Sequence, residues 1–79
     1  MIEIERRQPH LANQLMKISK IYHRQNQPVQ AIEYAAKGFK LSPESIKAAT
    51  LLADLYNETK QYEKSVVVID MFIKNNKRN

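Results

Sequence analysis

The side chains of this sequence that could do chemistry are few and stand apart. His10 and His23 have no histidine or carboxylate four positions further along, and the chain has no cysteine, so the ligand spacing of a zinc site is missing. Asp54 and Glu58 would share one face of a helix, where two carboxylates could act as general acid and general base. Such a pair more often lies on a solvated helix surface, which is the interpretation we favour.

The remaining polar groups indicate structure rather than catalysis. A single glycine rules out a glycine-rich phosphate loop. The tyrosines could stack nucleic-acid bases, but three of the four fall at packing positions or at helical spacing, which is typical of a core. The serines have roles in packing or in helix capping, and they are Ser19, Ser42, Ser45 and Ser65. We therefore predict no enzyme activity, no metal and no cofactor.

Composition narrows the class of protein further. The chain has 79 residues, no cysteine, one glycine and three prolines, which indicates one small domain without disulfides and argues against a turn-rich all-β protein. No apolar run approaches the ~20 residues of a membrane span, and the first residues, MIEIERRQPH, lack the apolar core of a signal peptide. We expect a cytoplasmic, reducing location. The net charge of +5 is spread along the chain, with no polybasic block beyond the tail KNNKR.

The spacing of apolar residues predicts four helices. They are expected at residues 11–24, 28–40, about 44–58 and about 62–75. Asn26 tolerates left-handed backbone at the first break, and Pro28 suits the first turn of a helix because its missing N–H has no partner there. Ser42 as N-cap and Pro43 as first helical residue predict the start of the third helix. The faces expected to be buried are Leu11, Leu15, Ile18 and Tyr22 on the first helix and Ile46, Ala49, Leu52, Ala53 and Tyr56 on the third.

The segment SVVVIDMFI, residues 65–73, is ambiguous by itself. Its four consecutive β-branched residues are typical of a buried strand. β-Branching lowers helix propensity by only a few tenths of a kcal/mol per residue, whereas burial of a Val or Ile side chain stabilises by ~1.5–3 kcal/mol. Packing can therefore override propensity, and the helical surroundings favour a helix here.

The two halves of the chain match at an offset of about 34 residues. The matched positions pair Ile18 with Leu52, Ser19 with Ala53, Tyr22 with Tyr56 and Ala31 with Ser65. A helix-turn-helix unit with this period resembles the tetratricopeptide repeat family over residues 12–79, with one unit at 12–45 and a second at 46–79. The resemblance implies an all-α fold of two hairpins stacked as a short right-handed superhelix. Residues 1–11 would form an N-terminal arm.

The sequence departs from the family's pattern at several positions. Asn26 and Lys60 stand where the hairpin turns usually have glycine. The second unit has the bulky Phe72 at the position that Gly38 occupies in the first. Lys77 takes the place of the closing proline. The resemblance therefore rests on the joint recurrence of degenerate motifs at one period.

The resemblance implies a concave groove, lined by the first helix of each unit, that binds a helical or extended peptide of a partner protein. Lys17, Lys20 and Arg24 share one helix face and could attract an acidic partner. Chaperone-binding members of the family grip a C-terminal carboxylate with one Lys and two Asn, but Met16, Lys20 and Leu51 stand at those places, so this function is disfavoured. The implied groove residues are Asn13, Met16, Lys17, Lys20, His23, Arg24, Lys47, Thr50, Leu51, Asp54, Asn57 and Glu58.

The last helix is expected to carry a second interaction surface. Its inner face would comprise Ser65, Ile69 and Phe72, together with Val66 and Ile73. Val67, Val68 and Met71 cannot all be hidden by the preceding helix. We therefore expect another polypeptide, most simply a second copy of the chain, to cover a surface formed by Val67, Val68, Met71 and Phe72.

Three functions are compatible with these patterns. The favoured one is a non-catalytic protein–protein interaction module, adaptor or chaperone-like. The second is a self-assembling fragment of a longer array, since two units are fewer than the ~3 that usually give independent stability. The third is a nucleic-acid binder, suggested by the net charge of +5. It is disfavoured because helical-repeat RNA readers have a unit one residue longer and because the acidic pair would lie in the groove.

Overall fold

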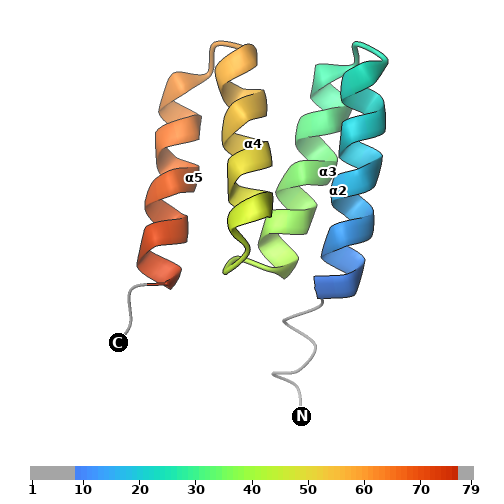
Figure 1. Cartoon of the computed structure of the whole chain (residues 1–79). Coiled ribbons are helices and arrows are strands. Elements are labelled where there is room, and N and C mark those ends of the chain that lie inside the picture. The colour runs from blue at the N-terminus through green and yellow to red at the C-terminus, as the bar shows by residue number, and fades with distance from the viewer. Residues whose placement is uncertain (1–8, 77–79) are drawn as a thin grey trace.

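The part of the chain that the structure describes forms four helices in two hairpins (Figure 1). The computed structural model describes residues 9–76, in which α2 (Pro9–Arg24) and α3 (Pro28–Leu41) form the first hairpin. The second hairpin comprises α4 (Ile46–Glu58) and α5 (Tyr62–Asn75). Residues 9–76 contain no strand, so the predictions of an all-α fold and of a helix over SVVVIDMFI are confirmed.

Parts of both predicted terminal segments lie outside the residues that the structure describes. The predicted N-terminal arm lies outside the described residues over positions 1–8, and residues 9–11 belong to α2 instead. The end of the basic tail, residues 77–79, also lies outside the described range. Among residues 9–76, no helix has the length and hydropathy that crossing a bilayer requires.

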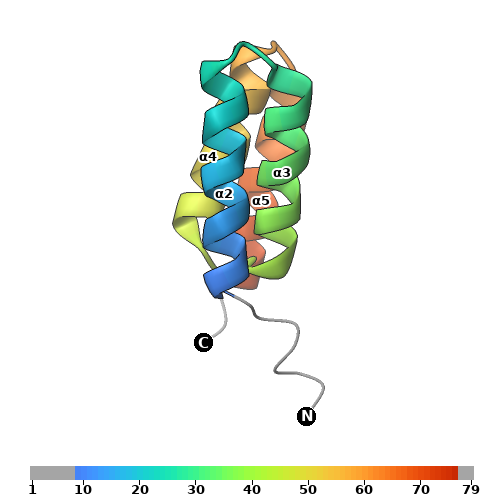
Figure 2. The same cartoon turned by 90° about the vertical axis from the view of Figure 1, so that its right-hand side faces the viewer.

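The helices form two layers, which Figure 2 shows from the edge: α2 and α4 lie in one layer, and α3 and α5 lie in the other. Helices that follow each other in the chain pack together, so α3 contacts both α2 and α4, and α5 packs on α4. α2 and α4 touch only lightly. The α2/α4 layer is therefore open between its two helices, which positions the first candidate site.

The two hairpin turns share one backbone geometry at an offset of 34 residues, the length of the repeat in the sequence. Asn26 and Lys60 both take the left-handed conformation, with φ of 60° and 62°. In each turn the next N–H donates to the carbonyl five positions earlier, which is the long bond of a Schellman motif. These bonds run from Gln27 to Tyr22 at 3.0 Å and from Gln61 to Tyr56 at 2.7 Å. The repeat is therefore present in the backbone as well as in the side chains.

Replacing Lys60 with glycine should stabilise the protein by about 1 kcal/mol, because a left-handed conformation costs a residue with a Cβ roughly 1–2 kcal/mol and costs glycine little. Asn26→Gly is the matched control and should change stability less, since asparagine tolerates this conformation. Urea unfolding followed by circular dichroism measures both. A loss of stability in Lys60→Gly would contradict the left-handed assignment.

The start of α4 differs from the prediction by two to three residues. Ser45, not Ser42, is the N-cap, and its side chain accepts a hydrogen bond from the Ala48 N–H at 3.1 Å. Ser42 caps the end of α3 instead, and its hydroxyl donates to Glu44 at 3.0 Å. Ser42, Pro43 and Glu44 form the connecting turn, which the Ser45 N–H closes by donating to the Ser42 carbonyl at 3.0 Å.

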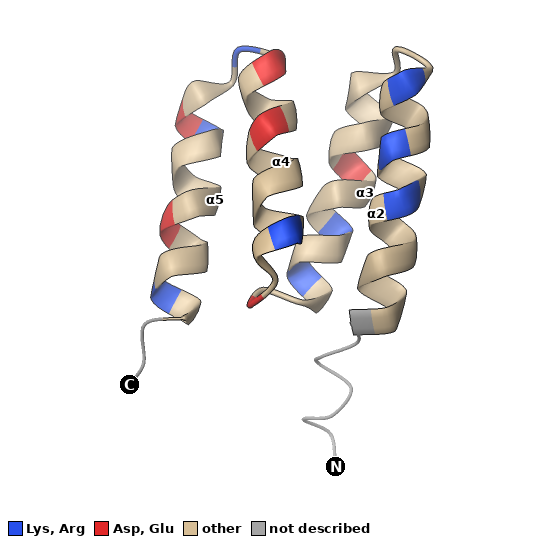
Figure 3. Cartoon of the chain, in the orientation of Figure 1, with Lys and Arg blue, Asp and Glu red and all other residues tan. Residues whose placement is uncertain are grey.

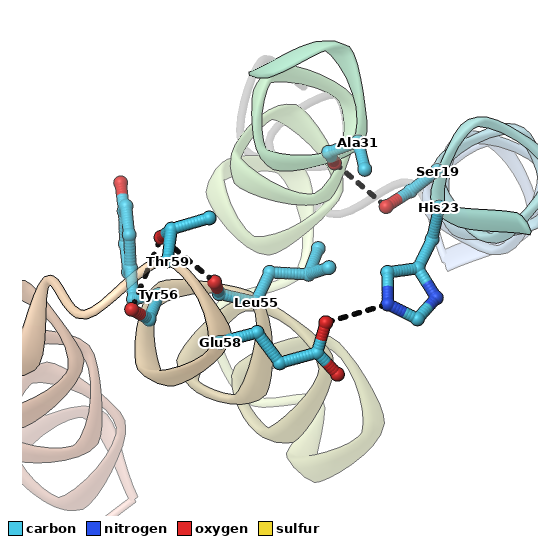
Figure 4. Close-up of polar contacts among 7 residues, drawn as sticks. All are labelled: Ser19, His23, Ala31, Leu55, Tyr56, Glu58 and Thr59. Carbon is cyan, nitrogen blue, oxygen red and sulfur yellow. Dashed lines mark hydrogen bonds and ion pairs between the residues drawn. The ribbon is translucent and has the colours of Figure 1, made fainter. Parts of the chain in front are cut away.

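Small residues let the helices approach closely at the centre of the molecule. Ala31 and Ala35 on α3 and Ala48 on α4 have no exposed surface. The buried Ser19 hydroxyl on α2 donates to the Ala31 carbonyl of α3 at 2.6 Å (Figure 4). Gly38 lies against α2 so closely that an added Cβ would be 3.3 Å from the Ala12 carbonyl oxygen. The first hairpin is thus fixed by contacts that leave no room for larger side chains.

Several predicted buried faces are rotated from the observed ones. On α2 the buried residues are Ala12, Met16 and Ser19, whereas Leu11 and Ile18 are exposed. On α4, Ala49, Leu52 and Ala53 are buried as predicted, but Ile46 is exposed. On α5 the inner face is Ser65, Val68 and the half-buried Phe72, so the predictions that Val66, Ile69 and Ile73 face α4 and that Val68 is exposed were wrong.

The two neighbouring valines of α5 test this register directly. Val68 is 5% exposed and Val66 is 65% exposed. Val68→Ala should cost about 2 kcal/mol through lost burial, whereas Val66→Ala should be close to neutral because alanine is also the better helix former. Urea unfolding of the two variants compares them. Equal losses, or a larger loss at position 66, would contradict the observed face of α5.

Candidate functional site

A groove between α2 and α4 is the first candidate site. Its cavity has a volume of about 790 Å³. The two hairpins contribute about equally to it, because α2 forms one wall and the start and middle of α4 form the other. The lining residues are His10, Asn13, Gln14, Met16, Lys17, Lys20, Ile46, Lys47, Thr50, Leu51 and Asp54.

Most of the predicted groove residues lie in this α2/α4 groove. Those that line it are Asn13, Met16, Lys17, Lys20, Lys47, Thr50, Leu51 and Asp54. Met16 is buried and Leu51 is half-buried, so these two side chains form an apolar floor rather than an exposed wall. Arg24 and Asn57 are exposed but are not part of the lining.

The other two predicted groove residues bridge the hairpins. His23 Nε2 on α2 lies 2.6 Å from Glu58 Oε1 on α4 (Figure 4). Both residues lie in the last turn of their helices. The pair therefore connects the walls at the end of the groove nearest the hairpin turns. The Glu58 carboxylate is used in this contact instead of pairing with Asp54 as an acid–base couple.

Three lining residues were not predicted from the sequence. His10 precedes the predicted start of the first helix, and Gln14 lies one turn before Lys17 on the same wall. Ile46 was assigned to the core but is 62% exposed at the mouth of the groove. The signal for Gln14 was its helical spacing from Lys17, whereas Ile46 lies at the first position of a helix whose start was misplaced.

The charge of the α2/α4 groove is unequal between its walls. Figure 3 shows Lys and Arg on the half of α2 that leads into α3, and acidic residues on the half of α4 that leads into α5. Lys17 and Lys20 face the cavity from α2, and Lys47 faces it from α4, while Asp54 is the acidic member of the lining. Lys17 and Lys20 of α2 therefore lie level with Leu51 and Asp54 of α4, toward the end of the groove nearest the hairpin turns, whereas Lys47 lies near the start of α4.

The side chains of this groove can make both polar and apolar noncovalent contacts. Ammonium groups, amides and a hydroxyl stand over an apolar floor, and an apolar surface with a few polar groups is typical of ligand-binding clefts in general. The residues that the structure describes include no group of three or more His, Asp or Glu side chains that could hold a metal ion.

A second, smaller groove lies on the opposite layer, between α3 and α5, and has a volume of about 450 Å³. Its floor includes the buried Phe39 and Leu52. It is lined by Ala36, Phe39, Lys40, Pro43, Leu52, Tyr56, Lys64, Val67, Val68 and Met71. Of the predicted interface on the last helix, Val67 and Met71 are exposed at this α3/α5 groove, Val68 is at its floor, and Phe72 is outside it.

Comparison of the chain with protein-family models, with curated proteins and with solved structures gives no match.

Proposed function

We propose that this protein is a non-catalytic protein–protein interaction module that binds a helical or extended peptide segment of a partner in the α2/α4 groove. The observation that carries the proposal is the cavity of about 790 Å³ to which both hairpins contribute a wall. A site built from two units is present only when both are folded and stacked. Binding of a partner would therefore also stabilise the stack by mass action.

The partner segment that this groove suits is acidic and amphipathic. Met16 and Leu51 at the floor would contact its apolar side chains. Lys17, Lys20 and Lys47 would contact its carboxylates. Exposed charges of this kind contribute more to the rate of association and to specificity than to affinity.

We further propose that the two hairpins are tetratricopeptide-type units. The support is the shared turn geometry of Asn26 and Lys60 at the 34-residue offset of that family. An adaptor or chaperone-like role in a reducing, cytoplasmic compartment accords with the cysteine-free sequence.

Self-assembly through α5 is the second candidate function, and it is supported by exposed apolar side chains on that helix. Nucleic-acid binding has less support for two reasons. The acidic Asp54 lines the groove beside its lysines, and the floor of the groove is apolar.

Charge reversal in the groove tests the proposed function. Lys17→Glu with Lys20→Glu should weaken binding of an acidic amphipathic peptide by roughly tenfold at low salt, and the difference should shrink at high salt because exposed charges are screened. Fluorescence anisotropy of the labelled peptide, titrated at several salt concentrations, measures the effect.

The matched control carries the same change in net charge on another helix. Lys37→Glu with Lys40→Glu alters α3, outside the α2/α4 groove. This control should bind the peptide nearly as well as the wild type does. Equal losses in both double variants would assign the effect to net charge and would count against the groove.

A further inference from the structure

α5 is apolar around most of its circumference, although it packs on the rest of the molecule along one side only. Ser65 and Val68 face inward and are buried. Val67 and Met71 lie beside the α3/α5 groove. A helix with apolar residues all round is normally buried on more than one side.

A further stripe of apolar residues on α5 lines neither the α2/α4 groove nor the α3/α5 groove. Its four members follow spacings of four, three and four residues, which is the pattern of a helix that packs on another helix. We call this stripe the outer seam, and it comprises Tyr62 (58% exposed), Val66 (65%), Ile69 (41%) and Ile73 (52%). The seam spans about 16 Å, at 1.5 Å per residue over the eleven steps between its ends.

The position of α5 leaves the outer seam open. Figure 1 shows α5 at one end of the molecule, with α4 between it and the first hairpin. Among the described residues, those of the seam are all more than two-fifths exposed, so no helix of the same chain covers it.

The charges beside the outer seam identify what could cover it. On the helical wheel Glu63, Asp70 and Lys74 lie along one flank of the seam, and the Lys74–Asp70 ion pair at 3.2 Å places Lys74 on that flank. Glu63 is in the first turn of α5 and Lys74 is in the last. The flank thus carries a carboxylate, Glu63, at one end and the Asp70–Lys74 ion pair at the other, where Lys74 is its one basic group.

This arrangement is complementary to itself when two helices run in opposite directions. In an antiparallel pair of identical helices, like flanks meet, so Glu63 of each copy would lie near Lys74 of the other. The opposite flank holds Ser65 and Phe72, which are turned toward α4 and offer no charge, so a parallel pair lacks these contacts.

We propose that a second copy of the chain covers the outer seam, with α5 packed antiparallel on α5 of the other copy. Tyr62 would then meet Ile73 of the other copy, and Val66 would meet Ile69. One helix face covers less than the ~800 Å² per partner of a standard interface. We therefore expect a weak dimer, with a dissociation constant near the micromolar range. The dimer makes the second candidate function, self-assembly through α5, specific, and it does not depend on peptide binding, because the α2/α4 groove lies on other helices.

Light scattering after size exclusion, over a series of protein concentrations, tests the proposal. The wild type should pass from monomer to dimer. Ile69→Glu with Ile73→Lys should raise the dissociation constant by more than about a hundredfold, because it buries charges in an apolar contact. Val67→Glu with Met71→Lys has the same spacing, similar exposure and the same charges, but it lies beside the α3/α5 groove, so it should leave the dimer intact.

Cross-linking tests the direction of the helices without relying on disruptive variants. The chain has no cysteine, so single cysteines report on single positions. Tyr62→Cys mixed with Ile73→Cys should form a disulfide-linked heterodimer on mild oxidation, and neither variant alone should cross-link efficiently. A wild type that stays monomeric at every concentration, loss of the dimer in the Val67/Met71 variant only, or cross-linking of each variant with itself would each overturn the proposal.

Discussion

Leu55→Ala should lower the free energy of unfolding by about 3 kcal/mol, within the 2–5 kcal/mol usual for removing a buried leucine. Leu55 is 2% exposed in the last turn of α4 and belongs to the core that joins the two hairpins. Shortening it leaves a cavity, and helices fixed by close contacts elsewhere cannot collapse to fill it. A loss of this size is a large part of the ~4–12 kcal/mol available to a domain of 79 residues.

The matched control for Leu55→Ala is Leu51→Ala, one turn earlier on the same helix. Leu51 is half-buried at the floor of the α2/α4 groove, so its truncation should cost less than half as much stability but should weaken peptide binding. Urea unfolding monitored by far-UV circular dichroism gives both free energies. If the two losses are equal, the core does not lie where the structure places it.

Gly38→Leu should destabilise the protein by about 3 kcal/mol, at the upper end of what overpacking usually costs. An added Cβ at Gly38 would be 3.3 Å from the backbone oxygen of Ala12 and 3.4 Å from Met16 Cγ. The methionine side chain can move, but the backbone oxygen can move only if α2 shifts. A leucine side chain would therefore separate the helices of the first hairpin and disturb the α2/α4 groove that α2 lines.

Two comparisons separate this steric effect from helix propensity. Gly38→Ala should be near neutral, because the gain of roughly 1 kcal/mol in helix propensity offsets a contact that is too close by a few tenths of an ångström. Lys37→Leu, at the exposed neighbouring position, should change stability by less than about 0.5 kcal/mol. Tolerance of leucine at position 38 would mean that α2 and α3 are further apart than observed.

The sequence predicted the helices well because their ends are set locally. Pro28 begins α3, and the left-handed Asn26 ends the turn before it, so both limits depend on residues close in the chain. The start of α4 was misplaced because Ser42 and Ser45 are both acceptable caps, and only the packing of Ser42 at the end of α3 decides between them. The local sequence favours the two serines equally as N-caps, and the tertiary contacts of Ser42 determine that Ser45 caps α4.

The orientation of α5 could not be predicted for a related reason. Val66, Val67 and Val68 are chemically identical, so hydropathy does not indicate which of them faces α4. The crossing of α5 over α4 selects Val68. The groove was predicted more completely, because its exposed residues on α2, such as Asn13, Lys17 and Lys20, are polar. Their type distinguishes them from the buried side of the same helix.

The way the helices follow one another bears on how fast the chain folds. Apart from the light contact between α2 and α4, every pair of packed helices is consecutive in the sequence, joined by a short turn. Closing such short loops costs little chain entropy, so native contacts form before distant segments must meet. Helical proteins with this low contact order fold within microseconds to milliseconds. We therefore expect that either hairpin can form first and that the chain spends little time with its apolar surfaces exposed to water.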